Sequence, residues 1–506
     1  MLQLFQMQKK TISLKTGYVL LYLLFLISGT LICFHHYISY DESYSMCLIR
    51  HSYSDIIRIT SLDVHPPLYY LLLKTWMLPF GESIPAARLF SLLIYTAFVS
   101  LGPLMVGRLF TKETGFLFTF FAITLPACQS YLYSEIRMYG LAALLVTACS
   151  LFAFGIAKSR TSLNVGQWVG LFITGILGAY TQYYALIAVA FIYIALFTDM
   201  LCHKKLKKNY LPLLGCLVAS CSLYIPWLFV LLRQFSVVSH SYWIGSFTLH
   251  TYLSFAAFPF YCSIHIGASF LYIILFTLMI SLMYWKAAAA LFRKNNKHKT
   301  LSQNKQHAVL LFLLPYLMVI VTGCAVSLLV RPLFSARYIK CILGLLLLCF
   351  SVIVADAKQS VLKNLLVLFC AIFAFANFCS IYKKNAENNR MVVSYIRFLD
   401  SIEGNAVFSA KQSHLMGIHA FYHKNGTEYI PQETYTAELE AFSPTLCPVS
   451  DSGQFHKEQV WVISEEDFGV LRKIGFLDGT ISDTGPMFSF SDQTESFSIQ
   501  YIQISP

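Results

Sequence analysis

Residues 17–42, GYVLLYLLFLISGTLICFHHYISYDE, contain an apolar run long enough to cross a bilayer, which is followed by two adjacent acidic residues. A helix of about 20 apolar residues spans a hydrocarbon core about 30 Å thick. No small-residue cleavage site follows this run, so we expect a permanent membrane helix and no cleaved signal peptide.

Similar apolar runs recur as far as residue 382. They lie at 17–37, 86–107, 115–131, 139–157, 165–181, 184–201, 210–232, 267–285, 308–330, 338–355 and 362–382. The pattern predicts a polytopic α-helical membrane protein with about eleven spans. The composition agrees, since 57% of the residues are hydrophobic and 12% are charged, against about 25% charged in soluble proteins. An ordinary soluble enzyme is excluded.

Charge divides the chain into two parts. From Lys383 onward there are 9 Lys and Arg against 16 Asp and Glu, whereas the preceding residues hold 28 basic and 9 acidic side chains. We therefore expect a basic membrane body, residues 1–382, and a water-soluble acidic domain, residues 383–506. Short strand-like runs at 406–409 and 460–464 and helical patterns at 412–423 and 465–474 predict a small mixed α/β domain.

Lysine and arginine indicate the orientation. With a cytoplasmic N-terminus, 19 of these residues in the membrane body fall on the inner side and eight on the outer side, as the positive-inside rule requires. An odd number of spans then places the C-terminal domain outside. Six of the nine acids also fall outside, and ionisable groups that gather near a bilayer face indicate a functional site.

The first outer loop, residues 38–85, is the longest between spans. Apolar and polar residues alternate at helical spacing over 54–62, which is typical of a helix lying in the interface. We expect this loop to cover a cavity, because long ordered loops commonly carry function.

Two motifs in or beside this loop carry chemistry. Asp41 and Glu42 follow the first span directly, and such a pair suits a general base and a neighbour that positions it or binds a cation. Asp63 and His65 precede two prolines that fix the backbone at the start of an apolar helix. The alternative interpretation of both motifs is purely structural, as solvated or packed helix ends.

Two further motifs fall on the same outer side. Glu135 and Arg137 lie in a very short turn, and Arg331, Arg337 and Tyr338 follow a late span. Guanidinium groups suit bidentate phosphate recognition, although an arginine at a helix end also acts as an interfacial anchor. Carboxylates that accept a proton beside arginines that hold an anion fit a lipid-linked phosphate donor. There is no Gly-rich phosphate loop and no Cys/His metal spacing.

In combination these motifs resemble those of the GT-C membrane glycosyltransferases. The closest branch is the bacterial protein-mannosyltransferase and aminoarabinose-transferase-like group, of the family 39 or 83 type. The resemblance covers residues 15–380 and rests on the acid pair, on DVHPPLYY at 63–70, on EIRMY at 135–139 and on RPLFSARY at 331–338.

The resemblance implies a polyprenyl-phosphate-linked sugar donor and inverting transfer at the periplasmic side of a bacterial inner membrane. Asp41 would activate the acceptor, with Glu42 as its partner. By position, Arg137 and Arg337 would bind the donor phosphate or sugar, and His65 and Tyr338 would line the cavity. The motifs add Arg331, Asp63 and Glu135 to the residues that we expect at the donor. The acceptor, a glycan, a lipid or a protein, stays open, and so does a divalent metal; no other cofactor and no nucleic acid is implied.

Three other functions are compatible with a membrane protein of this composition. A transporter or flippase of lipid-linked sugars would carry charges near the bilayer midplane and repeated halves, whereas these acids lie at one edge. A polymerase or ligase of lipid-linked glycans would favour a long loop late in the chain. A non-catalytic scaffold would be insensitive to replacement of Asp41.

Overall fold

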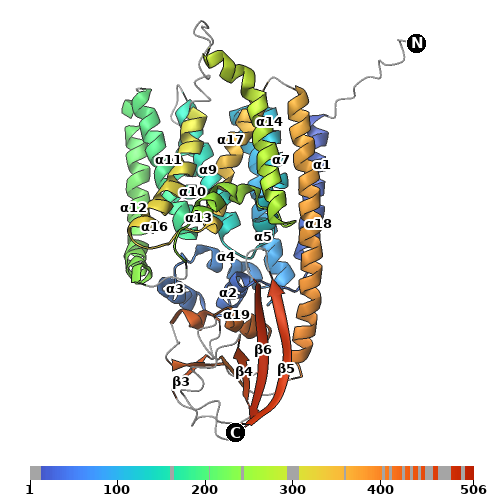
Figure 1. Ribbon diagram of the computed structural model, residues 1–506. Coiled ribbons are helices and arrows are strands. Elements are labelled where there is room, and N and C mark those ends of the chain that lie inside the picture. Colours follow the sequence, from blue (N-terminus) through green and yellow to red (C-terminus); the bar gives the residue numbers. More distant parts are fainter. Residues whose placement is uncertain are drawn as a thin grey trace, which may run out of the picture.

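The computed structural model is a helical bundle with a strand-containing region at one end (Figure 1). It describes residues 13–159, 164–203, 206–240, 244–292, 307–357, 360–401, 405–408, 413–423, 428–432, 437–442, 446–450, 460–464, 480–491 and 496–505. The main helices of the bundle are α1 (Leu14–Cys33), α5 (Ile84–Leu101), α7 (Lys112–Thr124), α8 (Pro126–Tyr131), α9 (Tyr139–Lys158), α10 (Val165–Thr181), α11 (Tyr183–Cys202), α12 (Leu206–His240), α13 (Leu249–Ala257), α14 (Ile266–Phe292), α16 (Leu314–Leu329), α17 (Leu343–Asp356) and α18 (Ser360–Leu399). Shorter turns are η1 (Gly102–Val106), α6 (Gly107–Leu109), η2 (Phe258–Phe260), η3 (Val309–Leu313) and η4 (Ala336–Ile342).

Eight helices of the described residues are long and apolar enough to cross a membrane, and two shorter apolar helices accompany them, Val165–Thr181 and Gly267–Leu282. The protein is therefore a multi-pass membrane protein, with fewer full-length spans than the eleven expected. The run at 115–131 shows why, because the chain breaks at Pro126 between α7 and α8. Leu125 adopts an extended conformation there, as the residue before a proline commonly does.

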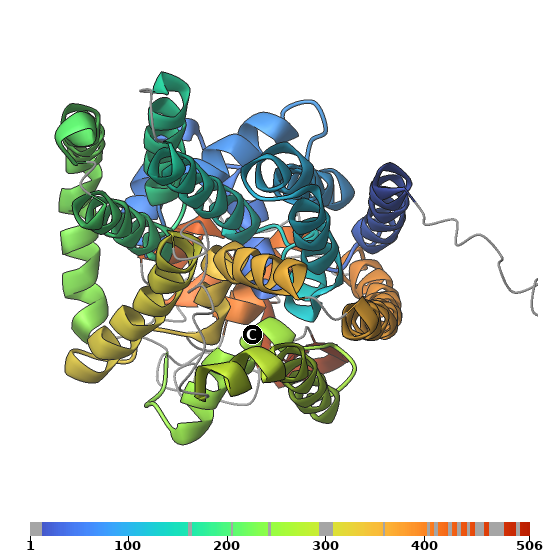
Figure 2. The ribbon, with the colours of Figure 1, turned by 90° about the horizontal axis from the view of Figure 1, so that it is seen from above.

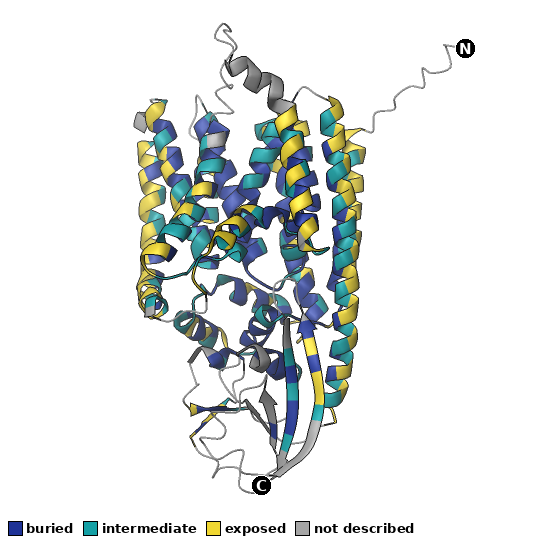
Figure 3. Cartoon of the chain, viewed as in Figure 1, coloured by how far each residue is buried: buried dark blue, intermediate teal, exposed yellow. Residues whose placement is uncertain are grey.

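Burial separates the inner helices from the outer ones. In the most apolar stretch of α9, 83% of the residues are buried. The corresponding shares are 22% in α1 and 17% in α12. The outer helices carry many exposed residues (Figure 3). Large aliphatic side chains are among them, as expected of helices that face lipid. Viewed from above, α9 lies inside the bundle while α1, α12 and α18 border it (Figure 2).

The expected outer loop folds into three short helices below the bundle (Figure 1). They are α2 (Tyr40–Leu48), α3 (Tyr53–Leu62) and α4 (Leu68–Met77). Ser39 and Ser52 cap the first two of these helices through their side chains, which satisfies backbone donors that have no intrahelical partner. The helix expected over 54–62 is α3.

The C-terminal region contains a mixed six-stranded sheet in the order β3-β2-β1-β4-β6-β5. Its elements are β1 (Asn405–Phe408), α19 (Ser413–Tyr422), β2 (Glu428–Pro431), η6 (Ala437–Ala441), β3 (Cys447–Val449), β4 (Val460–Ser464), β5 (Thr480–Ser491) and β6 (Ser496–Ser505). β1 pairs in parallel with β2 and β4, and β6 is antiparallel to β4 and β5. The strands expected at 406–409 and 460–464 correspond to β1 and β4, and the helix at 412–423 to α19; the helix at 465–474 lies outside the described residues.

This region is joined to the membrane body by one helix and by polar contacts. α18 continues from the bundle through residues 382 and 383 to Leu399, so the charge boundary falls inside a helix. Arg50 at the end of α2 donates hydrogen bonds to the carbonyl oxygens of Ala420 and Phe421, at 2.8 and 3.0 Å. The sheet domain therefore rests on the loop helices.

Candidate active site

The two acids at the start of α2 have different surroundings. Glu42 completes a capping box, in which its Oε2 accepts from the Ser39 N–H at 2.9 Å. The same oxygen accepts from Arg88 Nη2 at 2.9 Å, and Oε1 accepts from the Ile136 N–H at 3.1 Å. Because Glu42 is only 4% exposed, its carboxylate fixes α2 to α5 and to the turn before α9.

Asp41 faces the opposite way, towards two arginines. Its Oδ2 accepts from Arg337 Nη1 at 3.1 Å, and its Oδ1 lies 3.8 Å from Arg137 Nη2. Burial alone would raise the pKa of Asp41, but Arg137, Arg337 and Lys340 outweigh it and hold that pKa below its usual range. Asp41 is thus ionised at neutral pH, and a quarter of its side chain is exposed (24%).

Arg137 is held from several sides and is only 4% exposed. It donates to the Asp41 carbonyl oxygen at 3.2 Å and to the Tyr70 hydroxyl at 3.3 Å. His65 Nε2 accepts from its Nη2 at 3.1 Å. These contacts leave Arg137 little freedom to move towards a ligand.

The proline-containing motif lies behind Arg137. Asp63 Oδ2 accepts a hydrogen bond of 2.7 Å from Tyr44, whose ring lies 5.6 Å from the Arg137 guanidinium. Burial lowers the pKa of His65 to about 4, since the opposing effect of Asp63 is smaller. His65 is therefore neutral near pH 7 and acts as an acceptor for Arg137.

A second ion pair stands beside Asp41. Lys340 Nζ, on η4, lies 2.8 and 2.9 Å from the two carboxylate oxygens of Glu135. Its ammonium also lies 4.6 and 4.5 Å from the ring centroids of Tyr131 and Tyr139, a cation–π arrangement. Burial raises the pKa of Glu135, and Lys340 opposes this effect.

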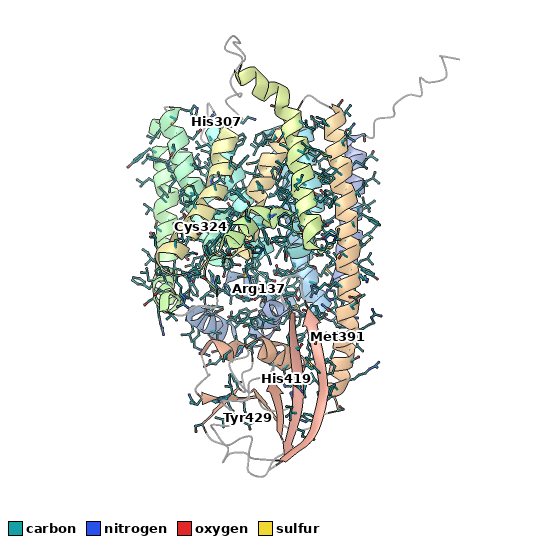
Figure 4. The ribbon with its side chains drawn as sticks, viewed as in Figure 1. Arg137, His307, Cys324, Met391, His419 and Tyr429 are labelled. Carbon is teal, nitrogen blue, oxygen red and sulfur yellow. The ribbon has the colours of Figure 1, made fainter. Side chains whose placement is uncertain are left out.

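A cavity of about 110 Å³ opens at this place. Its charged and amide-bearing wall consists of Asp41, Glu42, Arg88, Gln129, Glu135, Arg337, Lys340, Lys384, Asn385 and Asn388. Among the residues expected at the site, Asp41, Glu42, Glu135 and Arg337 border the cavity. Figure 4 shows Arg137 at the level where the bundle meets α2 and α4.

The other expected residues lie outside this wall, as far as the chain is described. Arg137, His65 and Asp63 form the layer behind Asp41. Tyr338 stacks on Tyr184 with ring centroids 4.6 Å apart. Arg331 is half-buried, in the loop between α16 and η4.

Several residues of the wall were missed in the sequence. Arg88 is a lone cation in an otherwise apolar helix, a signal that is visible in retrospect because such a charge needs a partner. Lys340 comes three residues after Arg337, on the same short helix. Lys384, Asn385 and Asn388 follow the last apolar run and carry no signal of their own, since only the continuation of α18 brings them to the cavity.

Metal ligation was left open by the sequence. Within the described residues, groups of three or more His, Cys, Asp or Glu side chains able to share an ion do not occur beside Asp41, whose oxygens face arginines. Such a group occurs at the far end of α11 and is treated below.

Comparison with solved structures establishes the class of fold. ArnT from Cupriavidus metallidurans in the apo state matches with a TM-score of 0.64 and 12% identity, over 97% of this chain and 98% of that chain. ArnT bound to undecaprenyl phosphate matches with a TM-score of 0.63 and 11% identity, over 96% and 97%. No family model and no curated protein sequence matches.

The chain is thus a polytopic membrane protein with the GT-C glycosyltransferase fold. Within that class its architecture is ArnT-like along nearly the whole length of both chains. The resemblance noted in the sequence is confirmed for the fold.

Proposed function

We propose that this protein transfers a sugar from a polyprenyl-phosphate-linked donor to a cell-envelope acceptor. The observation that carries the proposal is the Asp41 carboxylate, held against two arginines on the wall of a cavity that Lys340 also lines. The ArnT-like fold supports it, since one ArnT structure holds undecaprenyl phosphate.

The chemistry follows from the charges. Asp41 takes a proton from an acceptor hydroxyl or amine, whose lone pair attacks the anomeric carbon of the donor sugar. The bond between that carbon and the phosphate oxygen breaks on the opposite face, so the configuration inverts. The lipid phosphate leaves with the bonding electrons, and cations stabilise its charge.

Arg337 and Lys340 are the cations that we assign to the donor phosphate. Both border the cavity, whereas Arg137 lies behind Asp41 and its Nη1 and Nη2 already contact Asp41, Tyr70 and His65. We therefore give Arg137 a positioning role, in place of the phosphate contact that the resemblance implies. Glu42 likewise positions α2 through Arg88.

Donor binding also prepares the base. A phosphate that draws Arg337 away removes part of the positive charge that lowers the pKa of Asp41. The pKa of Asp41 then rises towards its usual range, which makes the carboxylate a better proton acceptor. The base is thereby activated only when a donor is present.

We further propose the placement in the membrane. Eleven helical runs cross a bacterial inner membrane, including the short α7 and α10, with the N-terminus in the cytoplasm. The cavity and the sheet domain then face the periplasm, where the acceptor is a glycan, a lipid or a protein.

A transfer assay tests the proposal. Purified full-length protein is incubated with radiolabelled polyprenyl-phosphate sugars and a membrane extract, alongside Asp41→Asn. Label should leave the lipid with the wild type and stay with the variant, while donor binding persists in both. Equal transfer by Asp41→Asn would reject the base, and movement of intact donor across vesicle membranes without transfer would favour a flippase.

A further inference from the structure

A second cluster of ionisable side chains lies at the other end of the bundle. Asp199, on α11, and His203, directly after that helix, are four residues apart. His307 lies in the helical residues that lead into η3. One ligand atom from each residue lies within 4.8 Å of those of the other two. Figure 4 shows His307 near the end of the helices that is remote from Arg137.

The carboxylate of this cluster is completely enclosed. Asp199 is 0% exposed and His307 is 3% exposed. His203 Nδ1 lies 3.2 Å from Asp199 Oδ1, and His307 Nδ1 contacts the same oxygen. The two imidazole rings stack with centroids 4.4 Å apart.

Asp199 lacks the hydrogen bonds that a buried carboxylate requires. Neither of its oxygens accepts a hydrogen bond from the described residues. A buried carboxylate without a compensating partner is strongly unfavourable. Two imidazole nitrogens converge on it at ion-pair distance, so the charge is balanced either by a protonated imidazole or by a cation that all three side chains bind.

We propose that Asp199, His203 and His307 bind a divalent transition metal ion, with Zn²⁺ as the best match. Two histidines and one carboxylate are a common zinc ligand set, and imidazole disfavours Mg²⁺ and Ca²⁺. Ligand atoms around tetrahedral zinc lie about 3.4 Å apart, so small side-chain rotations bring these three onto one ion.

The position of this site implies a structural role. Tyr184, at the start of α11, stacks on Tyr338 near the candidate active site, and Asp199 lies roughly 20 Å further along the helix. The ion would fasten the end of α11 to η3 and α16, which re-enter the bundle at His307. This role is independent of the proposed glycosyl transfer.

Metal binding by the full-length protein tests the inference. Protein purified in detergent without a polyhistidine tag is stripped with EDTA, desalted and titrated with Zn²⁺. Retained zinc is measured by mass spectrometry, and the thermal midpoint is recorded with and without metal. We expect one zinc per chain and a higher midpoint, with affinity at least tenfold weaker in Asp199→Asn and His307→Gln. His250→Gln, an exposed histidine on α13, is the matched control.

The competing explanation is a buried histidine–aspartate ion pair without metal. It predicts that Zn²⁺ leaves the wild-type midpoint unchanged and that wild type retains no more zinc than Asp199→Asn; either result overturns the proposal. If the variants do not fold, Co²⁺ added to the stripped wild type decides. The strong visible absorption of four-coordinate cobalt supports the site, and the weak spectrum of hydrated cobalt overturns it.

Discussion

The Arg337 guanidinium lies 3.1 Å from the Asp41 carboxylate, although 296 residues separate the two in the chain. The contact joins the first loop helix to the short helix η4 that precedes α17. It also couples the charge state of the proposed base to whichever anion competes for Arg337. The candidate active site therefore combines residues from the beginning and from the end of the membrane body.

Asp41→Asn should bind the donor at least as tightly as the wild type while its turnover falls about 10²- to 10⁴-fold. The amide removes the anion that competes with phosphate for Arg337. Equilibrium binding of a polyprenyl-phosphate sugar, measured beside single-turnover transfer, separates the two effects. Asp55→Asn is the control, since Asp55 is a partly exposed acid of the neighbouring α3. Markedly weaker donor binding by Asp41→Asn would contradict this competition.

Arg337→Gln should weaken donor binding by about tenfold or more, because a charged hydrogen bond to phosphate is lost. Its thermal midpoint should fall less than that of Arg137→Gln, since the Arg337 side chain is 20% exposed and the Arg137 side chain 4%. Arg58→Gln is the control for the loss of an exposed arginine on the same side. Unchanged donor affinity would indicate that other residues of the cavity wall contact the phosphate.

Arg137→Gln should act mainly on stability. Removing one partner of a buried ion pair costs about 3–5 kcal/mol, and Arg137 also supports Tyr70 and His65. Thermal unfolding in detergent measures the loss, and the donor affinity of the folded fraction distinguishes positioning from direct contact. A stable variant that binds no donor would restore the phosphate role implied by the resemblance.

Glu42→Gln should also destabilise the fold by about 3–5 kcal/mol, because it leaves the buried Arg88 uncompensated. The double variant Glu42→Gln with Arg88→Met should recover part of the loss, since no unpaired charge remains. Thermal unfolding of the two single variants and the double variant forms a cycle that isolates the pair. Additive losses in that cycle would show that the two side chains act independently.

The sequence predicts the membrane body well, because apolar runs of about 20 residues mark helices long enough to cross the hydrocarbon core. Each predicted apolar run overlaps one or more helices, and the amphipathic pattern over 54–62 coincides with α3. The number of full-length spans was harder to predict, since Pro126 divides one apolar run into two short helices. The extent of α18 was missed because its polar continuation leaves the bilayer and no longer carries an apolar pattern.

The site was predicted as a set of residues and not as a geometry. Motif spacing brought Asp41, Arg137 and Arg337 to one face, and the structure places them in contact. Motif spacing alone did not show which of the two acids, Asp41 or Glu42, faces the arginines. Adjacent residues on a helix point in different directions, and the sequence does not give these directions relative to the bundle. Arg88 pairs with Glu42 and not with Asp41, which separates the surroundings of the two acids. Arg88 lies in an apolar run, and the apolar pattern predicts the span but not the partner of this arginine.

His65 should make the protein less stable as the pH falls from about 6.5 to 4. Burial lowers the pKa of His65 to about 4 in the folded state, while an unfolded histidine titrates near 6.5. Between these values the unfolded chain binds more protons, so the free energy of unfolding decreases as the pH falls. Thermal midpoints of wild type and His65→Gln, recorded from pH 7 to 4.5, measure the effect. The variant should show a flatter profile over this window, and His36→Gln, a histidine whose backbone N–H contacts Asn389, should retain the wild-type slope. Parallel profiles for wild type and His65→Gln would show that the acid sensitivity arises elsewhere.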